Sequence, residues 1–171
     1  MSTQVAIVAG AGGSLGHATA VTLAASGLTV VAVDRDERGL RELPGGVRSE
    51  VADTTDPGVV TPLIERIADE VGPPGVLVNT IGAFRGMAAY SVSKAALVHL
   101  TRILDIELRP HGIRVNAVAP QLLDTPANRA TLPDDVMAHV VTPEAIAGVI
   151  AFLVSDAAAP VSGAVLPAYG A

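Results

Sequence analysis

Two residues of this chain have the types and the spacing suited to proton transfer. Tyr90 and Lys94 lie four positions apart in the run GMAAYSVSKAAL, which predicts a helix with both side chains on one face. Lys94 is the only lysine, and the other cations are arginines. A compact ammonium beside a phenol favours release of the phenol proton, so the pair indicates general acid and base chemistry. The alternative is a surface lysine and a half-buried tyrosine at accidental spacing.

A glycine-rich turn is the second feature with chemical meaning. The run VAIVAGAGGSLG places its glycines between a predicted strand and the first turn of a predicted helix; they are Gly10, Gly12, Gly13 and Gly16. Glycines there let the backbone approach a phosphate, and the positive end of the helix attracts the anion. This indicates nucleotide binding, although such a turn can also be no more than a tight connection.

An acidic residue follows the second predicted strand. Asp34 stands 18 residues after Gly16, close to the distance at which an acid accepts hydrogen bonds from the ribose of a dinucleotide. Its charge would repel a 2'-phosphate, which favours NAD over NADP. Arg35 could pair with that phosphate and leaves NADP open. Asp34 could instead begin a solvated charged run and cap the next helix.

The elements that must position these residues alternate between strands and helices. Buried strands are predicted at 5–9, 28–33, 47–52, 76–79, 113–117 and 164–166, and helices at 14–26, 36–43, 57–71, 88–109 and 143–155. This alternation predicts an α/β fold with a doubly wound parallel sheet, Rossmann-like, in three layers. We expect a single domain over residues 1–171.

Charge and composition exclude several classes of function. The net charge of -6 leaves no basic patch for nucleic acid. No apolar run reaches the roughly 20 residues that cross a bilayer, and the first residues lack a signal-peptide pattern, so we expect a soluble cytoplasmic protein. There is no cysteine and the four histidines are far apart, so no metal site is expected.

Together these motifs resemble the short-chain dehydrogenase/reductase family. Tyr90 and Lys94 match its Y-x-x-x-K motif, and the glycine turn matches its first motif, with Ala9 in place of a threonine and Ser14 in place of a glycine. The resemblance implies NAD(P)-dependent hydride transfer to or from a small carbonyl or secondary alcohol, with Tyr90 as acid or base and Lys94 on the ribose. It implies further cofactor contacts at Ser14, Leu15, Asp53, Asn79, Ile81, Gly82, Pro120, Leu122 and Thr125.

The chain departs from the family pattern at the catalytic serine. The serine's usual place, about a dozen residues before the tyrosine, falls at Leu77 inside a predicted strand. Thr80 is a weak substitute, and Ser91 and Ser93 belong to the helix. Gln121 also replaces a usual glycine. These departures raise the alternative of a catalytically silent nucleotide-binding or oligomerising protein.

The serine is absent because a segment of the family pattern is missing. Only seven residues separate Gly82 from Tyr90, where about 50 further residues are expected, somewhat more than one helix–strand unit. The sheet would lose a central strand, and its two neighbours would have to meet or leave backbone groups unpaired.

Two further segments bear on assembly and access. The helix at 88–109 carries apolar residues on more than one face, which suggests pairing in a homo-oligomer, a dimer or tetramer, as well as burial within the monomer. The stretch 121–141 can be interpreted either as a mobile lid over an apolar substrate or as an ordinary surface loop.

Overall fold

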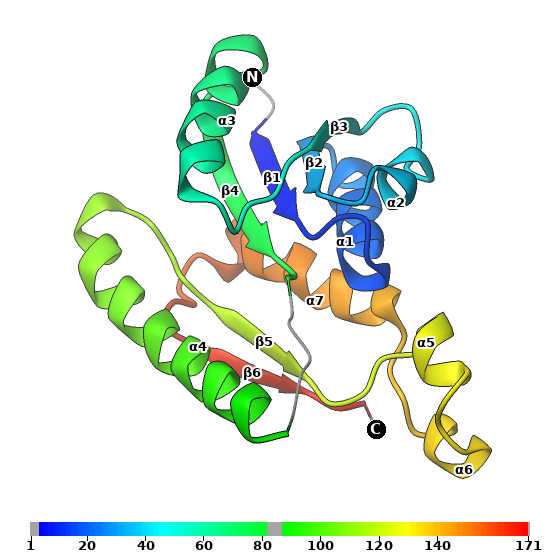
Figure 1. Ribbon diagram of the computed structural model, residues 1–171. Helices are drawn as coiled ribbons and strands as arrows, with labels where there is room; N and C mark the ends of the chain where they lie inside the picture. The colour runs from blue at the N-terminus through cyan, green and yellow to red at the C-terminus, as the bar shows by residue number, and fades with distance from the viewer. Residues whose placement is uncertain (1–3, 82–86, 171) are drawn as a thin grey trace. The chain divides into compact units, whose positions relative to one another are not determined.

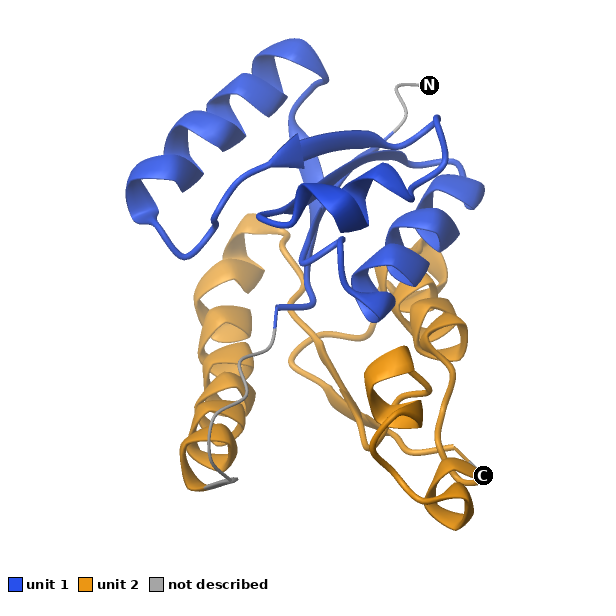
Figure 2. Ribbon diagram, turned by 45° about the vertical axis from the view of Figure 1, so that its right-hand side comes forward, with its two compact units in different colours: residues 1–81 blue, residues 82–171 orange. Residues whose placement is uncertain are grey.

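The computed structural model describes residues 4–81 and 87–170. The chain forms two compact units, residues 1–81 and 82–171, coloured separately in Figure 2. Each unit is described by itself below, and the single domain expected from the sequence stays a prediction.

The first unit is a parallel sheet with helices between its strands (Figure 1). Its elements in chain order are β1 (Val5–Ala9), α1 (Ser14–Ala25), β2 (Thr29–Asp34), α2 (Glu37–Arg41), β3 (Arg48–Val51), α3 (Pro57–Glu70) and β4 (Pro74–Asn79). The strand order is β3-β2-β1-β4, and every pair is parallel. The predicted α/β fold with a Rossmann-like parallel sheet is confirmed.

The core of the first unit lies on both faces of the two central strands. All five residues of β1 are buried, as are the four middle residues of β2. One face packs against α3, through Val5, Ile7, Val31, Val33, Leu63 and Ile67. Helix α1 contacts the same strands from the other side of the sheet (Figures 1 and 2). Nearly continuous apolar strands are what burial on two faces requires.

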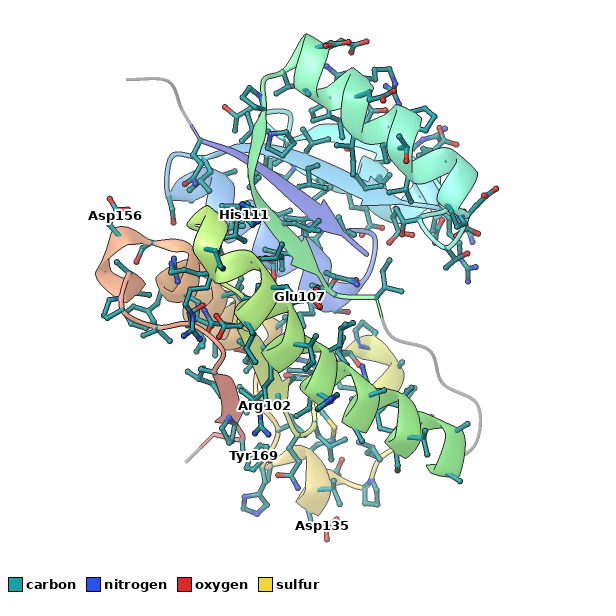
Figure 3. The ribbon with its side chains drawn as sticks, turned by 90° about the vertical axis from the view of Figure 1, so that its left-hand side faces the viewer. Arg102, Glu107, His111, Asp135, Asp156 and Tyr169 are labelled. Carbon is teal, nitrogen blue, oxygen red and sulfur yellow. The ribbon has the colours of Figure 1, made fainter. Side chains whose placement is uncertain are left out.

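The second unit is built on a long helix and a pair of parallel strands. Its elements are α4 (Met87–Leu108), a 3-10 turn (Arg109–His111), β5 (Ala117–Pro120), α5 (Pro126–Arg129), α6 (Asp134–Met137), α7 (Pro143–Val154), a second 3-10 turn (Asp156–Ala158) and β6 (Val165–Ala168). Arg102 and Glu107 lie along α4 and His111 lies just past its end (Figure 3). Strands β5 and β6 pair with each other in parallel, and α7 contacts β5.

The strands on either side of the missing segment belong to different sheets. Within the ranges 4–81 and 87–170, β4 pairs only with β1, and β5 pairs only with β6. Within the first unit, the outer edge of β4 is therefore unpaired.

The strand predicted at 113–117 is wrong in position, since β5 begins only at Ala117. The residues just before β5 are held by side-chain hydrogen bonds instead of a regular strand pairing. The Arg114 guanidinium and the Asn116 amide both donate to the Val161 carbonyl, at 3.1 and 3.0 Å, and Ser162 Oγ accepts from the Val115 N–H. The stretch 121–141 also contains two short helices, α5 and α6, that were not predicted from the sequence.

In the part of the chain that the structure describes, no helix combines the length and the apolar character that crossing a membrane requires.

Candidate functional site

The turn between β1 and α1 is built from close backbone contacts that only glycine permits. Gly10 adopts φ +84°, a left-handed conformation. A Cβ at Gly16 would stand 2.1 Å from the Gly10 carbonyl oxygen, so no side chain fits there. The N–H groups of Gly10 and Ala11 donate to the Val33 carbonyl and tie the turn to β2. The turn therefore presents bare backbone at the start of α1.

The N-terminus of α1 is uncapped by side chains. Its N-cap is Gly13, which offers no side chain, and its first turn contains no acid. Ser14 is exposed at the first helical position and does not cap the helix. Leu15 follows, half-buried. The free N–H groups and the positive helix end suit a phosphate.

Asp34 is fixed beside this turn by two backbone hydrogen bonds. Its Oδ2 accepts from the Gly12 N–H at 3.0 Å, and its Oδ1 accepts from the Asp36 N–H at 2.9 Å. Asp36 rather than Asp34 caps α2, by accepting from the Arg38 N–H, so the capping role considered for Asp34 is wrong. Each carboxylate oxygen can accept a further hydrogen bond, which leaves room for ribose hydroxyls.

Two further residues complete the turn: Gly39, which sequence reasoning missed, and Thr80, which it considered only as a weak substitute for the serine. A Cβ at Gly39 of α2 would lie 2.5 Å from the Gly12 carbonyl oxygen, so α2 sits directly on the glycine turn. A glycine inside a helix is unfavourable in itself, and that was the available signal. Thr80 Oγ1 donates to the Ala9 carbonyl at 2.9 Å and lies 3.2 Å from that of Gly10. Thr80 therefore holds the end of β4 against the turn.

The remaining sequence candidates of the first unit lie at the ends of β3 and β4. Asp53 Oδ1 accepts from the Thr55 hydroxyl at 2.7 Å and from the Thr55 N–H at 3.0 Å, and these bonds hold the pKa of Asp53 below its ordinary value. The guanidinium of the exposed Arg35 lies 3.9 Å from Oδ2 of Asp53. Asn79 Oδ1 accepts from the Ile81 N–H at 2.9 Å. Gly82 lies outside the described residues.

Tyr90 and Lys94 meet on one face of α4, as their spacing predicts. The Lys94 Nζ lies over the Tyr90 ring, 5.5 Å from its centroid, and both residues are half-buried. Ser93 Oγ donates to the Tyr90 carbonyl at 2.7 Å, so Ser93 serves the helix backbone. The helix thus holds a cation against the phenol ring.

The sequence candidates at the end of β5 and after it belong to a segment whose two ends are joined by backbone hydrogen bonds. Pro120 ends β5, and the half-buried Leu122 accepts from the Val141 N–H at 3.0 Å through its carbonyl. Asp124 N–H donates to the Val141 carbonyl at 2.8 Å, which closes the base of the segment. Thr125 Oγ1 caps α5 by accepting from the Asn128 N–H.

The first unit thus holds the glycine turn and Asp34, whereas the second holds the proton-transfer pair together with the cofactor candidates Pro120, Leu122 and Thr125. The first unit brings together the glycine turn, Asp34 and the ends of β3 and β4. A bare turn, a positive helix end and a carboxylate fit the pyrophosphate and ribose of a dinucleotide. Among residues 4–81 and 87–170, no three histidine, aspartate or glutamate side chains gather as a metal site would need.

Comparison with known proteins finds a matching family model in each half of the chain. A family model described as short chain dehydrogenase matches residues 4–86, and one described as Enoyl-(Acyl carrier protein) reductase matches residues 82–170. The chain is 31% identical to a galactitol 2-dehydrogenase of Rhizobium johnstonii, covering 94% of this chain and 91% of that protein. It is 26% identical to the 3-oxoacyl-[acyl-carrier-protein] reductase of Escherichia coli, covering 98% and 96%.

A solved structure has the same fold. The crystal structure titled ribose-5-phosphate isomerase, from Brucella melitensis, is 26% identical and superposes with a TM-score of 0.87, covering 98% of this chain and 91% of that chain.

The alignments also give the number of positions in the relatives that have no counterpart in this chain. The Escherichia coli alignment spans 235 positions, whereas 98% of 171 residues is only about 168, so about 67 positions have no residue from this chain. The same reasoning with 94% coverage gives about 74 for the Rhizobium protein. These totals cover the whole alignments, and the figure of about 50 expected between Gly82 and Tyr90 stays a prediction. The two family models meet at residues 82–86, where the sequence placed the gap.

The matched motifs, the parallel fold and relatives that align along nearly their whole length lead to one conclusion. This chain belongs to the short-chain dehydrogenase/reductase family of NAD(P)-dependent oxidoreductases.

Proposed function

We propose that this protein binds NAD in its first unit and uses Tyr90 and Lys94 to oxidise a secondary alcohol or reduce a carbonyl. The observation that carries the proposal is the Lys94 ammonium over the Tyr90 ring, on the helix that follows the missing segment. A bound nicotinamide supplies hydride exchange with the substrate carbon.

The residues of the first unit would hold the dinucleotide. The N–H groups at the start of α1 would bind the pyrophosphate, and Asp34 would accept hydrogen bonds from the adenosine ribose. Leu15, Asp53, Asn79 and Ile81 belong to the same proposed site. Pro120, Leu122 and Thr125 of the second unit stay proposed cofactor contacts that the family resemblance implies. Because Asp34 is already oriented by Gly12 and Asp36, its charge would meet a 2'-phosphate at close range and favour NAD.

The second unit would move the proton. The Tyr90 phenol oxygen gives a proton to the alkoxide formed on reduction, or takes one from the alcohol on oxidation. The Lys94 ammonium, held against the ring, would bind the ribose hydroxyls. The substrate is therefore a small molecule with a carbonyl or a secondary alcohol.

Activity measurements with two tyrosine variants test this role. NADH oxidation over a panel of carbonyl compounds should fall at least about 100-fold in Tyr90→Phe, because acid–base groups typically contribute that much or more. Nucleotide affinity should stay unchanged. The control is Tyr169→Phe, which changes the only other tyrosine, 55% exposed, and should keep full activity. Equal activity of wild type and Tyr90→Phe would refute the catalytic role.

A second candidate function is nucleotide binding without catalysis. The Thr80 hydroxyl is directed to the Ala9 and Gly10 carbonyls, so it does not take the place of the absent serine. In that case titration calorimetry would show NAD binding while no carbonyl is reduced. Absence of NAD binding would eliminate both candidates.

Cofactor preference rests on Asp34. We expect NAD to bind at least about tenfold more tightly than NADP, a difference of about 1.4 kcal/mol. Asp34→Asn keeps the shape of the side chain and removes its charge. The ratio of NAD affinity to NADP affinity should therefore fall, mainly because NADP binds more tightly. An unchanged ratio would contradict the role of this charge.

We also propose that the chain forms a homo-oligomer in which α4 takes part. Apolar side chains of this helix are exposed, with Val92 at 70% and Ile106 at 64%. Sedimentation of Ile106→Lys should show a smaller assembly than wild type. A wild-type monomer at micromolar concentration would contradict this proposal. The cytoplasmic location stays a prediction from the sequence.

A further inference from the structure

The outer edge of β4 has backbone groups directed away from the sheet. The Thr80 N–H donates to the Ala9 carbonyl, and Ala9 is in register with Asn79. In a parallel ladder, alternate residues bond the same neighbour, so Val76 and Val78 bond β1. Leu77 and Asn79 therefore direct their N–H and C=O groups toward the other edge. Within the first unit that edge pairs with no strand.

The two edge strands of this sheet differ in their charged residues. The β3 edge carries Arg48 and Glu50, which form ion pairs with Glu70 and Arg66 of α3. Such charges protect an edge from pairing with another chain. No charged residue lies between Pro74 and Ile81, and Leu77 is 69% exposed. The β4 edge, uncharged and apolar, therefore resembles a strand that pairs with a neighbour.

The alignments with two relatives contain about 67 and about 74 positions that have no residue from this chain. The two family models meet at residues 82–86, soon after β4 ends. The β4 edge that the first unit leaves unpaired is therefore open to a further strand.

We propose that a second copy of this chain covers the edge, with the two β4 strands antiparallel about a two-fold axis at Leu77. Leu77 of one copy then lies opposite Leu77 of the other as a hydrogen-bonded pair, and Gly75 lies opposite Asn79. No like charges face each other, because the strand has none. Leu77 is in register with Ile7, so the added leucine extends an existing apolar row. The two sheets become one sheet of twice as many strands.

The contact is small, and its strength follows from its size. A strand of six residues on each side buries less than the roughly 1,200 Å² at the lower end of stable interfaces. We therefore expect a reversible pair that dissociates on dilution below micromolar concentration.

Disulfide trapping tests the register in the full-length chain. The chain has no cysteine, so Leu77→Cys introduces a single thiol. Hydrogen-bonded antiparallel pairs have Cα atoms about 5.5 Å apart, which suits a disulfide. Under mild oxidation Leu77→Cys should form a covalent dimer at least about tenfold faster than the control, because pairing raises the local thiol concentration. The control is Val51→Cys, an apolar residue on the opposite edge that is 58% exposed.

Sedimentation gives a second, independent measurement. Leu77→Lys should halve the mass of the assembly at tens of micromolar, whereas Val51→Lys should not. Both sites are exposed, so circular dichroism should show folded variants. Oxidation of Leu77→Cys no faster than Val51→Cys, or an unchanged mass for Leu77→Lys, would overturn the proposal. Those results would be expected if the edge instead receives a peptide of another protein. Neither measurement depends on NAD binding or turnover.

Discussion

Replacing Gly16 by alanine tests the packing of the glycine turn most directly. A methyl group there would stand 2.1 Å from the Gly10 carbonyl oxygen, 2.6 Å from its carbon and 2.8 Å from the Ala11 Cα. All three are backbone atoms of a turn that is bonded to Val33, so none can move away without breaking that connection. The substitution is therefore expected to push α1 away from β1.

Two opposing effects set the magnitude. Alanine is favoured over glycine inside a helix by up to about 1 kcal/mol. Forcing a methyl into a packed site costs about 1–3 kcal/mol, and contacts this short belong at or above the upper end. The free energy of unfolding should therefore fall by about 2 kcal/mol, and NAD affinity should fall with it because the turn is distorted.

Urea unfolding followed by far-ultraviolet circular dichroism measures the change. The matched control is Gly148→Ala in α7, where an added Cβ meets nothing within 4 Å. The same substitution should there raise stability by about 0.5–1 kcal/mol, because only the helix preference acts. Tyrosine fluorescence follows the second unit, since Tyr90 and Tyr169 both belong to it. If Gly16→Ala were as stable as wild type, the close packing of the turn would be refuted.

Two further predictions concern single hydrogen-bonding groups. Thr80→Val keeps the shape but removes the hydroxyl that donates to Ala9, so it should lose about 1 kcal/mol in urea unfolding; Thr80→Ser should lose less, and equal losses would contradict the bond. Buried Asp105 accepts from Arg109 and Ser162, which lower its pKa. Its stabilisation is therefore present above its unfolded pKa, about 3.9, and is lost as pH falls through the lower folded value. Asp105→Asn should flatten the acid side of the stability profile, whereas Asp135→Asn, at an exposed site, should leave it unchanged.

The sequence alone determined the features that depend on neighbouring residues. Helix starts were placed well because capping is local: Pro57 begins α3 as predicted, and Tyr90 and Lys94 share a face because four residues complete a helical turn. The apolar runs of β1 and β2 likewise predicted strands buried on both faces. The gap after Gly82 was also visible, because motif spacing is a property of the sequence.

Only the tertiary structure decided how distant segments use their polar groups. Asp34 and Gly12 are 22 positions apart, and Thr80 and Ala9 are 71 apart, so no local pattern could show that these groups bond each other. The same holds for β5, whose start depends on side-chain bonds from Arg114 and Asn116 to Val161. The division of the strands into two sheets is also tertiary, because pairing depends on which strand is available as a neighbour.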